Sequence, residues 1–364
     1  MPPTSFFDRQ LDETTADDEM PEFESVLDET SAILPSRMLT WHYRSDDERL
    51  IAFSNANFYN GNLITFPSSW DRNPDLGVFF EHVDGATYGR GGSRANPEEA
   101  ERVVDLLSRE IKKRTNTEVA ITAMSLEQAT EITSRIEARA ATDDGLRSWL
   151  DEGNRVKNLE TVQGDQCDVM ILSFGYGRDA SGKLHLTFGP LNRADGYRRL
   201  NVAVTRSRKK TIVVASIRAA DIPASASAPV LLVREYLDYA ERGPIALTAN
   251  QKAVEGALPE SPLEDDVARE LIARGWSIHR QVGDGKYRID IGVRHPRQEG
   301  KYVAGIECDG ATYHSFQTAR DRDVARQEIL ERRGWTLFRV WSTDWFRHRE
   351  QVLTEMDRFL RSRL

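Results

Sequence analysis

The sequence contains very little cysteine, since only Cys167 and Cys308 occur among its 364 residues. Two cysteines so far apart, with no metal-ligand spacing, exclude a disulfide framework and a zinc-binding cysteine motif. No apolar run approaches the length of a membrane-spanning helix, and the N-terminus lacks the basic and apolar segments of a signal peptide. From these absences we expect a cytoplasmic protein with no membrane partner.

An excess of positive charge is also absent, because the net charge is -9. The first 30 residues hold ten acidic side chains and one arginine, so this segment, which we expect to be flexible, accounts for the whole negative charge. Between 193 and 210 the chain is locally basic, opposed there by little more than Asp195. This basic cluster is either a phosphate-binding surface or a solvated face. Its members are Arg193, Arg198, Arg199, Arg206, Arg208, Lys209 and Lys210.

Residues 31–245 have the pattern of one α/β domain. A short strand and then a helix are expected between 39 and 67, and helical spacing follows Pro97. Apolar segments predict four further strands, at 118–124, 157–164, 168–173 and 211–215. Apolar strands that alternate with helices indicate a mostly parallel sheet covered on both faces.

Residues 246–260 lose this pattern and are interpreted as a linker. The remaining segment, 261–364, predicts a smaller α/β domain. It begins with a helix and ends with another, and a charged helix is expected from about 320 to 333. Its predicted strands are 287–293, 302–308 and 336–341.

Three short motifs in the first domain are suited to a nucleotide. Gln163-Gly164-Asp165 forms a polar loop beside an apolar strand, and Arg206 follows the turn of helix Leu200-Asn-Val-Ala-Val. A guanidinium placed there can stabilise charge on a transferred phosphoryl group. With Trp41-His-Tyr-Arg44-Ser, these motifs resemble motifs IV, V and VI of the second RecA-like domain of superfamily 1 helicases.

The helicase resemblance implies a RecA-like fold in which Arg44 and Arg206 reach the ATP phosphates. It also implies that Gln163, Gly164 and Asp165 line the cleft, although Asp165 replaces the usual Glu. No Gly-x-x-x-x-Gly-Lys-Ser/Thr loop occurs in the sequence. The segment Met1–Phe7 resembles the tail of motif III, so we expect residues 1–30 to be a remnant of that region. We therefore expect ATP binding only beside a separate P-loop domain.

Acidic residues in the second domain are suited to a metal ion. Asp290 and Glu307 lie in consecutive predicted strands, so a hairpin can bring them together at one sheet edge. Two carboxylates can share Mg²⁺, which activates water for attack on a phosphodiester. Glu264, Asp309 and His314 enlarge this polar group.

Several segments of this domain resemble the PD-(D/E)xK nucleases, in particular the very-short-patch-repair-like and DUF559-like endonucleases. The segments are Tyr287-Arg-Ile-Asp290, Ile306-Glu307-Cys-Asp309-Gly-Ala-Thr-Tyr-His314, Arg320-Asp-Arg-Asp323 and Phe338-Arg-Val-Trp-Ser-Thr-Asp344-Trp. The resemblance implies that Asp290 and Glu307 are metal ligands and that Glu264 is a helix-borne catalytic acid. Asp309 occupies the position of the usual lysine, and His314 is the suggested substitute.

Two hypotheses follow. The first is a DNA-processing protein, part of a helicase joined to a Mg²⁺-dependent endonuclease. The second is a non-catalytic nucleic-acid-binding module from a split or truncated helicase gene. Under the second, Glu307 and Asp309 are an exposed strand end before a turn, and the arginines are surface residues.

Overall fold

The computed structural model describes most of the chain. The described residues are 26, 30, 33–35, 38–71, 73–113, 117–161, 166–193, 195–248, 261–283, 287–309 and 317–364, without the side chains of 248 and 317–323. Gln163, Gly164, Asp165 and His314 lie outside them, as does most of the acidic segment 1–30. Trp41–Leu364 form one compact unit, to which the following description refers.

A parallel sheet forms the core of the first part of this unit. Its strands are β1 Gly77–His82, β2 Val119–Ala123, β3 Lys157–Asn158, β4 Cys167–Ser173 and β5 Ser207–Ala215. Their spatial order is β1-β5-β4-β2-β3, and every pairing is parallel. The central strand β4 is buried along its whole length. The prediction of a RecA-like parallel sheet is confirmed.

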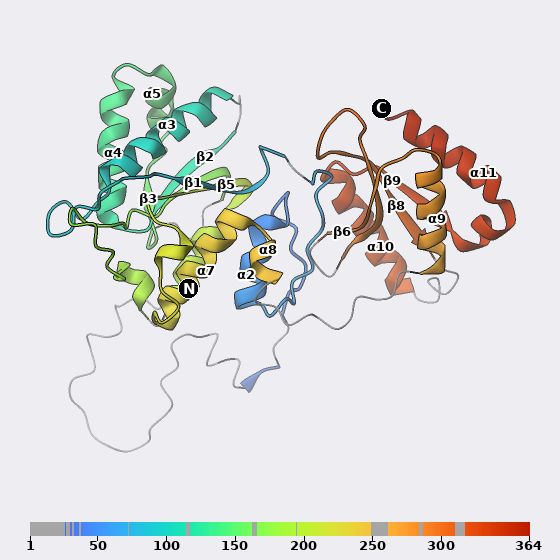
Figure 1. Cartoon of the computed structure of the whole chain (residues 1–364), viewed down its shortest axis with the longest axis horizontal. Helices are drawn as coiled ribbons and strands as arrows, with labels where there is room; N and C mark the ends of the chain where they lie inside the picture. Colours follow the sequence, from blue (N-terminus) through green and yellow to red (C-terminus); the bar gives the residue numbers. More distant parts are fainter. Residues whose placement is uncertain are drawn as a thin grey trace. The chain divides into compact units, whose positions relative to one another are not determined.

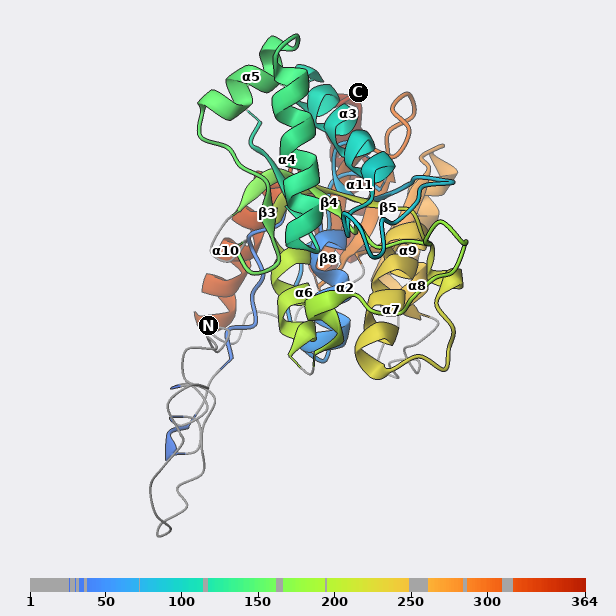
Figure 2. The same ribbon diagram turned by 90° about the vertical axis from the view of Figure 1, so that its left-hand side faces the viewer.

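Helices cover both faces of this sheet (Figures 1 and 2). One face carries α3 Pro97–Lys113, α4 Leu126–Ala140 and α5 Asp144–Asp151. The other carries α2 Arg49–Phe58, α6 Gly196–Val204 and α7 Ala228–Arg242. Short helical turns follow at η2 Gly189–Asn192, η3 Ala219–Asp221 and α8 Ile245–Thr248.

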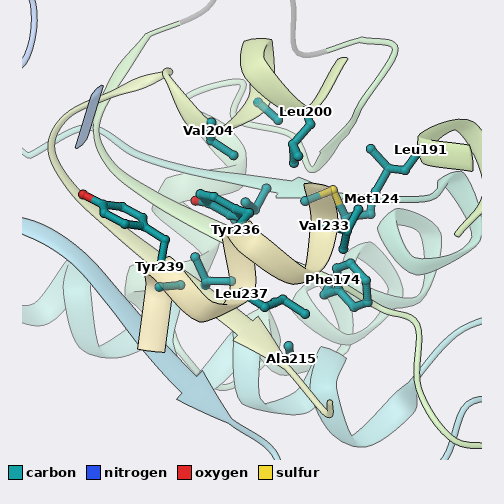
Figure 3. Packing of buried hydrophobic residues seen from close by; sticks show 14 of the residues in the cluster. Met124, Phe174, Leu191, Leu200, Val204, Ala215, Val233, Tyr236, Leu237 and Tyr239 are labelled. Atoms are coloured by element: carbon teal, nitrogen blue, oxygen red, sulfur yellow. The ribbon is translucent and has the colours of Figure 1, made fainter. Parts of the chain in front are cut away.

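The alternation of side chains along each strand fills two separate cores. Within β4, Val169 and Ile171 pack under α3 and α4, while Met170 and Leu172 pack under α6 and α7. Figure 3 shows part of the core under α6 and α7, in which Tyr236 of α7 is surrounded by apolar side chains. Full burial of a Val, Leu, Ile, Phe or Met side chain stabilises the folded chain by about 1.5–3 kcal/mol relative to leaving it exposed. These two cores join the sheet to the helices on its two faces.

A smaller mixed sheet forms the core of the second part. Its strands, in spatial order, are β6 Ile278–Val282, β7 Ile289–Arg294, β8 Tyr302–Asp309 and β9 Leu337–Trp341. The pairs β6-β7 and β7-β8 are antiparallel, whereas β8-β9 is parallel. The accompanying helices are α9 Pro262–Ala273, α10 Gln317–Arg332 and α11 Ser342–Arg361. The predicted smaller α/β fold is confirmed.

Two local predictions differ from the structure. The strand predicted at 157–164 ends at Asn158, because the chain turns there and Thr161 N donates to Asn158 O at 3.1 Å. The strand expected between 39 and 67 is reduced to one bridge between Trp41 and Ile64. Two strands, β1 and β6, were not predicted from the sequence. No helix among the described residues is long and apolar enough to span a membrane.

Residues 64–71, here called the strap, precede β1 in the sequence but pack on the second sheet. Phe66 is 1% exposed and lies in a cluster with Trp335. Trp335 Nε1 donates to Pro67 O at 2.9 Å, and the Arg333 guanidinium donates to Phe66 O. The strap therefore completes the core beside β7 and β8.

Candidate functional site

Asp290 and Glu307 come from neighbouring strands of the mixed sheet. The register of β7 and β8 sets Ile291 opposite Ile306, so Asp290 and Glu307 follow at opposed positions. Directly opposed residues of an antiparallel pair point to the same face. The N–H of Cys308 donates to Asp290 Oδ2 at 2.7 Å. The structure thus brings the two predicted metal ligands together.

The surroundings of these two carboxylates disfavour their ionised forms. Burial raises the pKa of Asp290 to about 6, and the charges of Glu264 and Asp309 add to the rise, whereas the Cys308 N–H opposes it. Burial also raises the pKa of Glu307 to about 7, with the charge of Asp290 as the next cause. Near neutral pH, the pair therefore favours the binding of a proton or a cation.

The hydroxyl group of Tyr287 holds Glu307 in place. It donates to Glu307 Oε1 at 2.5 Å, which lowers the pKa of the carboxyl group against the effect of burial. Tyr287 is itself buried beside Phe66 of the strap, with the ring centroids 5.6 Å apart. The orientation of Glu307 is therefore fixed by packing as well as by a hydrogen bond.

Two further predicted acids lie nearby, and each has a structural partner. Glu264 forms a reciprocal capping box with Ser261 at the start of α9, and its Oε2 accepts from Gln281 Nε2 at 2.9 Å. Asp309 forms an ion pair with Arg339, with Nε 3.1 Å from Oδ2. Their catalytic roles stay predictions.

The carboxylate pair is compatible with Mg²⁺. This ion is commonly held by one or two carboxylates and keeps several of its waters. Among the described residues, no group of three or more His, Cys, Asp or Glu side chains is arranged as a metal site. Of the described residues, Asp290 and Glu307 would hold a metal ion bound there, together with water.

The two predicted nucleotide arginines differ in their surroundings. Arg206 follows α6 and is half-buried, and its Nε donates to Val202 O at 2.5 Å. Arg44 is exposed, and its guanidinium bonds to no residue in the described part of the chain. The N–H of Asp46 donates to Arg208 O at 2.7 Å, which places the two motif segments side by side.

In the folded chain the basic cluster is opposed by carboxylates from outside the segment 193–210. Arg208 bonds to Asp168, with Nε 3.0 Å from Oδ1, and Lys209 Nζ lies 3.3 Å from the same oxygen. Lys210 forms a buried ion pair with Glu110, at 3.0 Å. These partners come from distant segments that the sheet brings together. Much of the cluster is therefore neutralised.

One cavity was not foreseen. It measures about 480 Å³ and lies beyond the carboxyl ends of β2 and β3, where ligands of parallel sheets gather. Its lining includes Tyr88, Arg90, Arg94, Asn158 and Tyr176. They come from three separate segments, around 88–94, 158 and 176, which no single local motif covers.

Comparison with protein families identifies both parts of the chain. Residues 21–218 match the family AAA_12, described as an AAA domain, and residues 263–360 match REase_MTES_1575. The first match covers more than half of the chain, so the chain belongs to the AAA_12 family. Its C-terminal part is a REase_MTES_1575 domain, a restriction-endonuclease-like domain. Both resemblances inferred from the motifs are confirmed.

Two curated relatives are similar over most of this chain. The "Uncharacterized ATP-dependent helicase MG140 homolog" of Mycoplasma pneumoniae is 30% identical over 339 residues, which cover 85% of this chain and 29% of that protein. The "Uncharacterized ATP-dependent helicase MG140" of Mycoplasma genitalium is 27% identical over 348 residues, with the same coverage. The chain thus spans 29% of the length of these relatives.

Among solved structures, the C-terminal domain of a possible DNA helicase from Lactobacillus plantarum WCFS1 was found. It has 18% identity and a TM-score of 0.30, and the match covers 54% of this chain and 96% of that one.

Proposed function

We propose that residues 261–364 form a Mg²⁺-dependent endonuclease domain that hydrolyses phosphodiester bonds of DNA. The observation that carries this proposal is the pair of largely buried carboxylates, Asp290 and Glu307, held at opposed positions on β7 and β8. Two like charges in such surroundings are costly unless a proton or a cation accompanies them. The match of this region to REase_MTES_1575 supports the same reaction class.

In this mechanism the chain itself orients the two carboxylates. The Cys308 N–H holds Asp290 and the Tyr287 hydroxyl holds Glu307, so little reordering accompanies ion binding. Mg²⁺, when bound by this pair, would supply an activated water and stabilise negative charge on the phosphate. Phe66 of the strap packs against Tyr287 and contributes to its burial.

Substitution of each carboxylate tests this proposal. Asp290→Ala and Glu307→Ala should each lower Mg²⁺-dependent cleavage of plasmid DNA by at least about 10²-fold, comparable with the loss of one transition-state contact. Glu299→Ala is the matched control, because this exposed carboxylate lies between the same two strands. Cleavage that persists in both variants and in the presence of a chelator would contradict the assignment.

We further propose that the AAA_12 part contributes half of an ATP site and contacts DNA beside a separate P-loop domain. The support is the adjacency of the Arg44 and Arg206 segments through the bond from Asp46 to Arg208. With a P-loop domain supplied, Arg206→Ala should lower ATP hydrolysis by about 10³-fold, the usual effect of an arginine finger. Arg193→Ala, an exposed arginine of the same basic cluster, is the control.

The competing function predicts a different set of results. A non-catalytic nucleic-acid-binding module would bind DNA, yet it would neither cleave DNA nor stimulate ATP hydrolysis by a P-loop domain. That combination would reject both enzymatic proposals.

A further inference from the structure

The candidate nuclease site requires a positive group besides any metal ion. Negative charge develops on the phosphate as water attacks, and a preorganised cation at that position lowers the barrier. Asp309 stands where the resemblance places a lysine, and its carboxylate is paired with Arg339. Asp309 carries no positive charge, and the charge of Arg339 is already paired with it. Neither residue therefore supplies the positive group beside Glu307.

Arg326 of α10 is the described cation that best meets this requirement. Its guanidinium carbon lies 3.3 Å from the centroid of the Tyr287 ring, a close stacking contact. Tyr287 in turn donates to Glu307 Oε1 at 2.5 Å. The side chain of Arg326 is half-buried, so the stacking holds its planar head beside the carboxylate pair.

The electrostatics agree with this geometry. The positive charge of Arg326 lowers the pKa of both Asp290 and Glu307, in opposition to the effect of burial. A charge that influences both carboxylates must lie close to both of them. Arg326 is thus a described cation that acts on both proposed metal ligands.

We propose that Arg326 contacts a non-bridging oxygen of the scissile phosphate and fills the role of the missing lysine. This inference rests on the proposed nuclease function. In the reaction, the water oxygen forms a new bond to phosphorus, and the bond from phosphorus to the leaving oxygen breaks. The water loses a proton to solvent, and the leaving oxygen takes one from solvent. Arg326 supplies positive charge and hydrogen bonds, and it keeps its own protons.

The proposed contact with phosphate depends on the planar shape of the guanidinium as well as on its charge. A planar guanidinium can donate two parallel hydrogen bonds to phosphate oxygens, which an ammonium group cannot do in the same geometry. Arg326→Lys should therefore restore only part of the activity that Arg326→Ala loses.

The test compares Arg326→Ala and Arg326→Lys with Arg332→Ala, a control at an exposed position of the same helix. Arg326→Ala should slow single-turnover cleavage by about 10²-fold. Binding of Mn²⁺, measured by calorimetry, should stay equal or become tighter, because a positive charge near the ion has been removed. Arg332→Ala should leave both quantities unchanged.

A substrate with a methylphosphonate at the mapped cleavage position gives a second measurement. This substitution removes one charged non-bridging oxygen, so it should slow the wild-type chain strongly and Arg326→Ala little further. Additive losses would overturn the proposal, as would wild-type cleavage by Arg326→Ala. A folded Arg326→Ala chain that loses Mn²⁺ binding would assign the residue a structural role instead.

Failure of the two proposals can be distinguished. If cleavage does not depend on Asp290 and Glu307, the nuclease assignment falls and this inference falls with it. If cleavage depends on those carboxylates but not on Arg326, only the present inference is wrong.

Discussion

The charged groups of the two sheets are arranged in opposite ways. At the amino-terminal edge of the parallel sheet, Lys210 and Arg208 each meet a carboxylate from another element. On the mixed sheet, Asp290 and Glu307 are brought together although their charges repel. In the first arrangement each charge is neutralised by a partner within the chain. The second arrangement becomes favourable when a cation is added. This difference separates a structural charge cluster from a candidate site.

The largest effect should follow from breaking the buried pair of the first sheet. The side chains of Lys210 and Glu110 are 7% and 1% exposed, so Lys210→Ala leaves a carboxylate buried beside no lysine. We expect a loss of about 3–5 kcal/mol of unfolding free energy. Urea denaturation would measure it. The double variant Lys210→Met, Glu110→Leu should recover most of the loss, and an unchanged single variant would contradict the structural reading of this pair.

Substitution of Glu307 should change the unfolding free energy in the opposite direction and stabilise the chain. The pKa of this acid rises from 4.5 to about 7 on folding, so the folded chain binds more protons than the unfolded chain between these values. Without metal, stability should therefore fall as the pH rises from about 4.5 to about 7. Glu307→Gln should remove this loss, which amounts to about 3 kcal/mol at and above pH 7.

Thermal unfolding at several pH values, with a chelator present, measures this effect. Glu299→Gln serves as the exposed control on the same hairpin. Added Mg²⁺ should stabilise the wild-type chain and not the Glu307→Gln variant. A destabilised Glu307→Gln chain would place this residue in the same class as Lys210.

The smallest effect should come from Arg208. Its ion pairs with Asp168 and Glu118 involve a side chain that is 35% exposed. Solvent screens such pairs, so Arg208→Ala should cost less than about 1 kcal/mol. The same urea denaturation measures it. A loss as large as that of Lys210→Ala would show that exposure does not divide the two kinds of pair.

Strands with long apolar runs could be predicted from the sequence. The predicted strands 287–293 and 302–308 agree with β7 and β8 to within two residues at each end, and their hairpin sets Asp290 opposite Glu307. By contrast, β6 reads Ile-His-Arg-Gln-Val and is only partly buried, so hydrophobic periodicity does not mark it as a strand.

Long-range partners could not be read in the same way. Asp168 and Arg208 meet because β4 and β5 are neighbours, and that neighbourhood depends on the spatial order of five strands. Arg326 was likewise one of several charged residues on a predicted helix. Only its stacking on Tyr287 distinguishes it from them. Packing between elements, rather than local pattern, supplied this part of the site.

The strap has a consequence for the order in which the chain folds. Pro67 and Trp335 are 268 positions apart, yet they share a hydrogen bond in the core of the second sheet. During synthesis, Phe66 leaves the ribosome long before Tyr287 and Trp335 exist to cover it. Phe66 therefore lacks these two partners until synthesis has passed Trp335. Contacts of such long sequence separation form slowly, so the completion of the carboxylate site is a late event in folding.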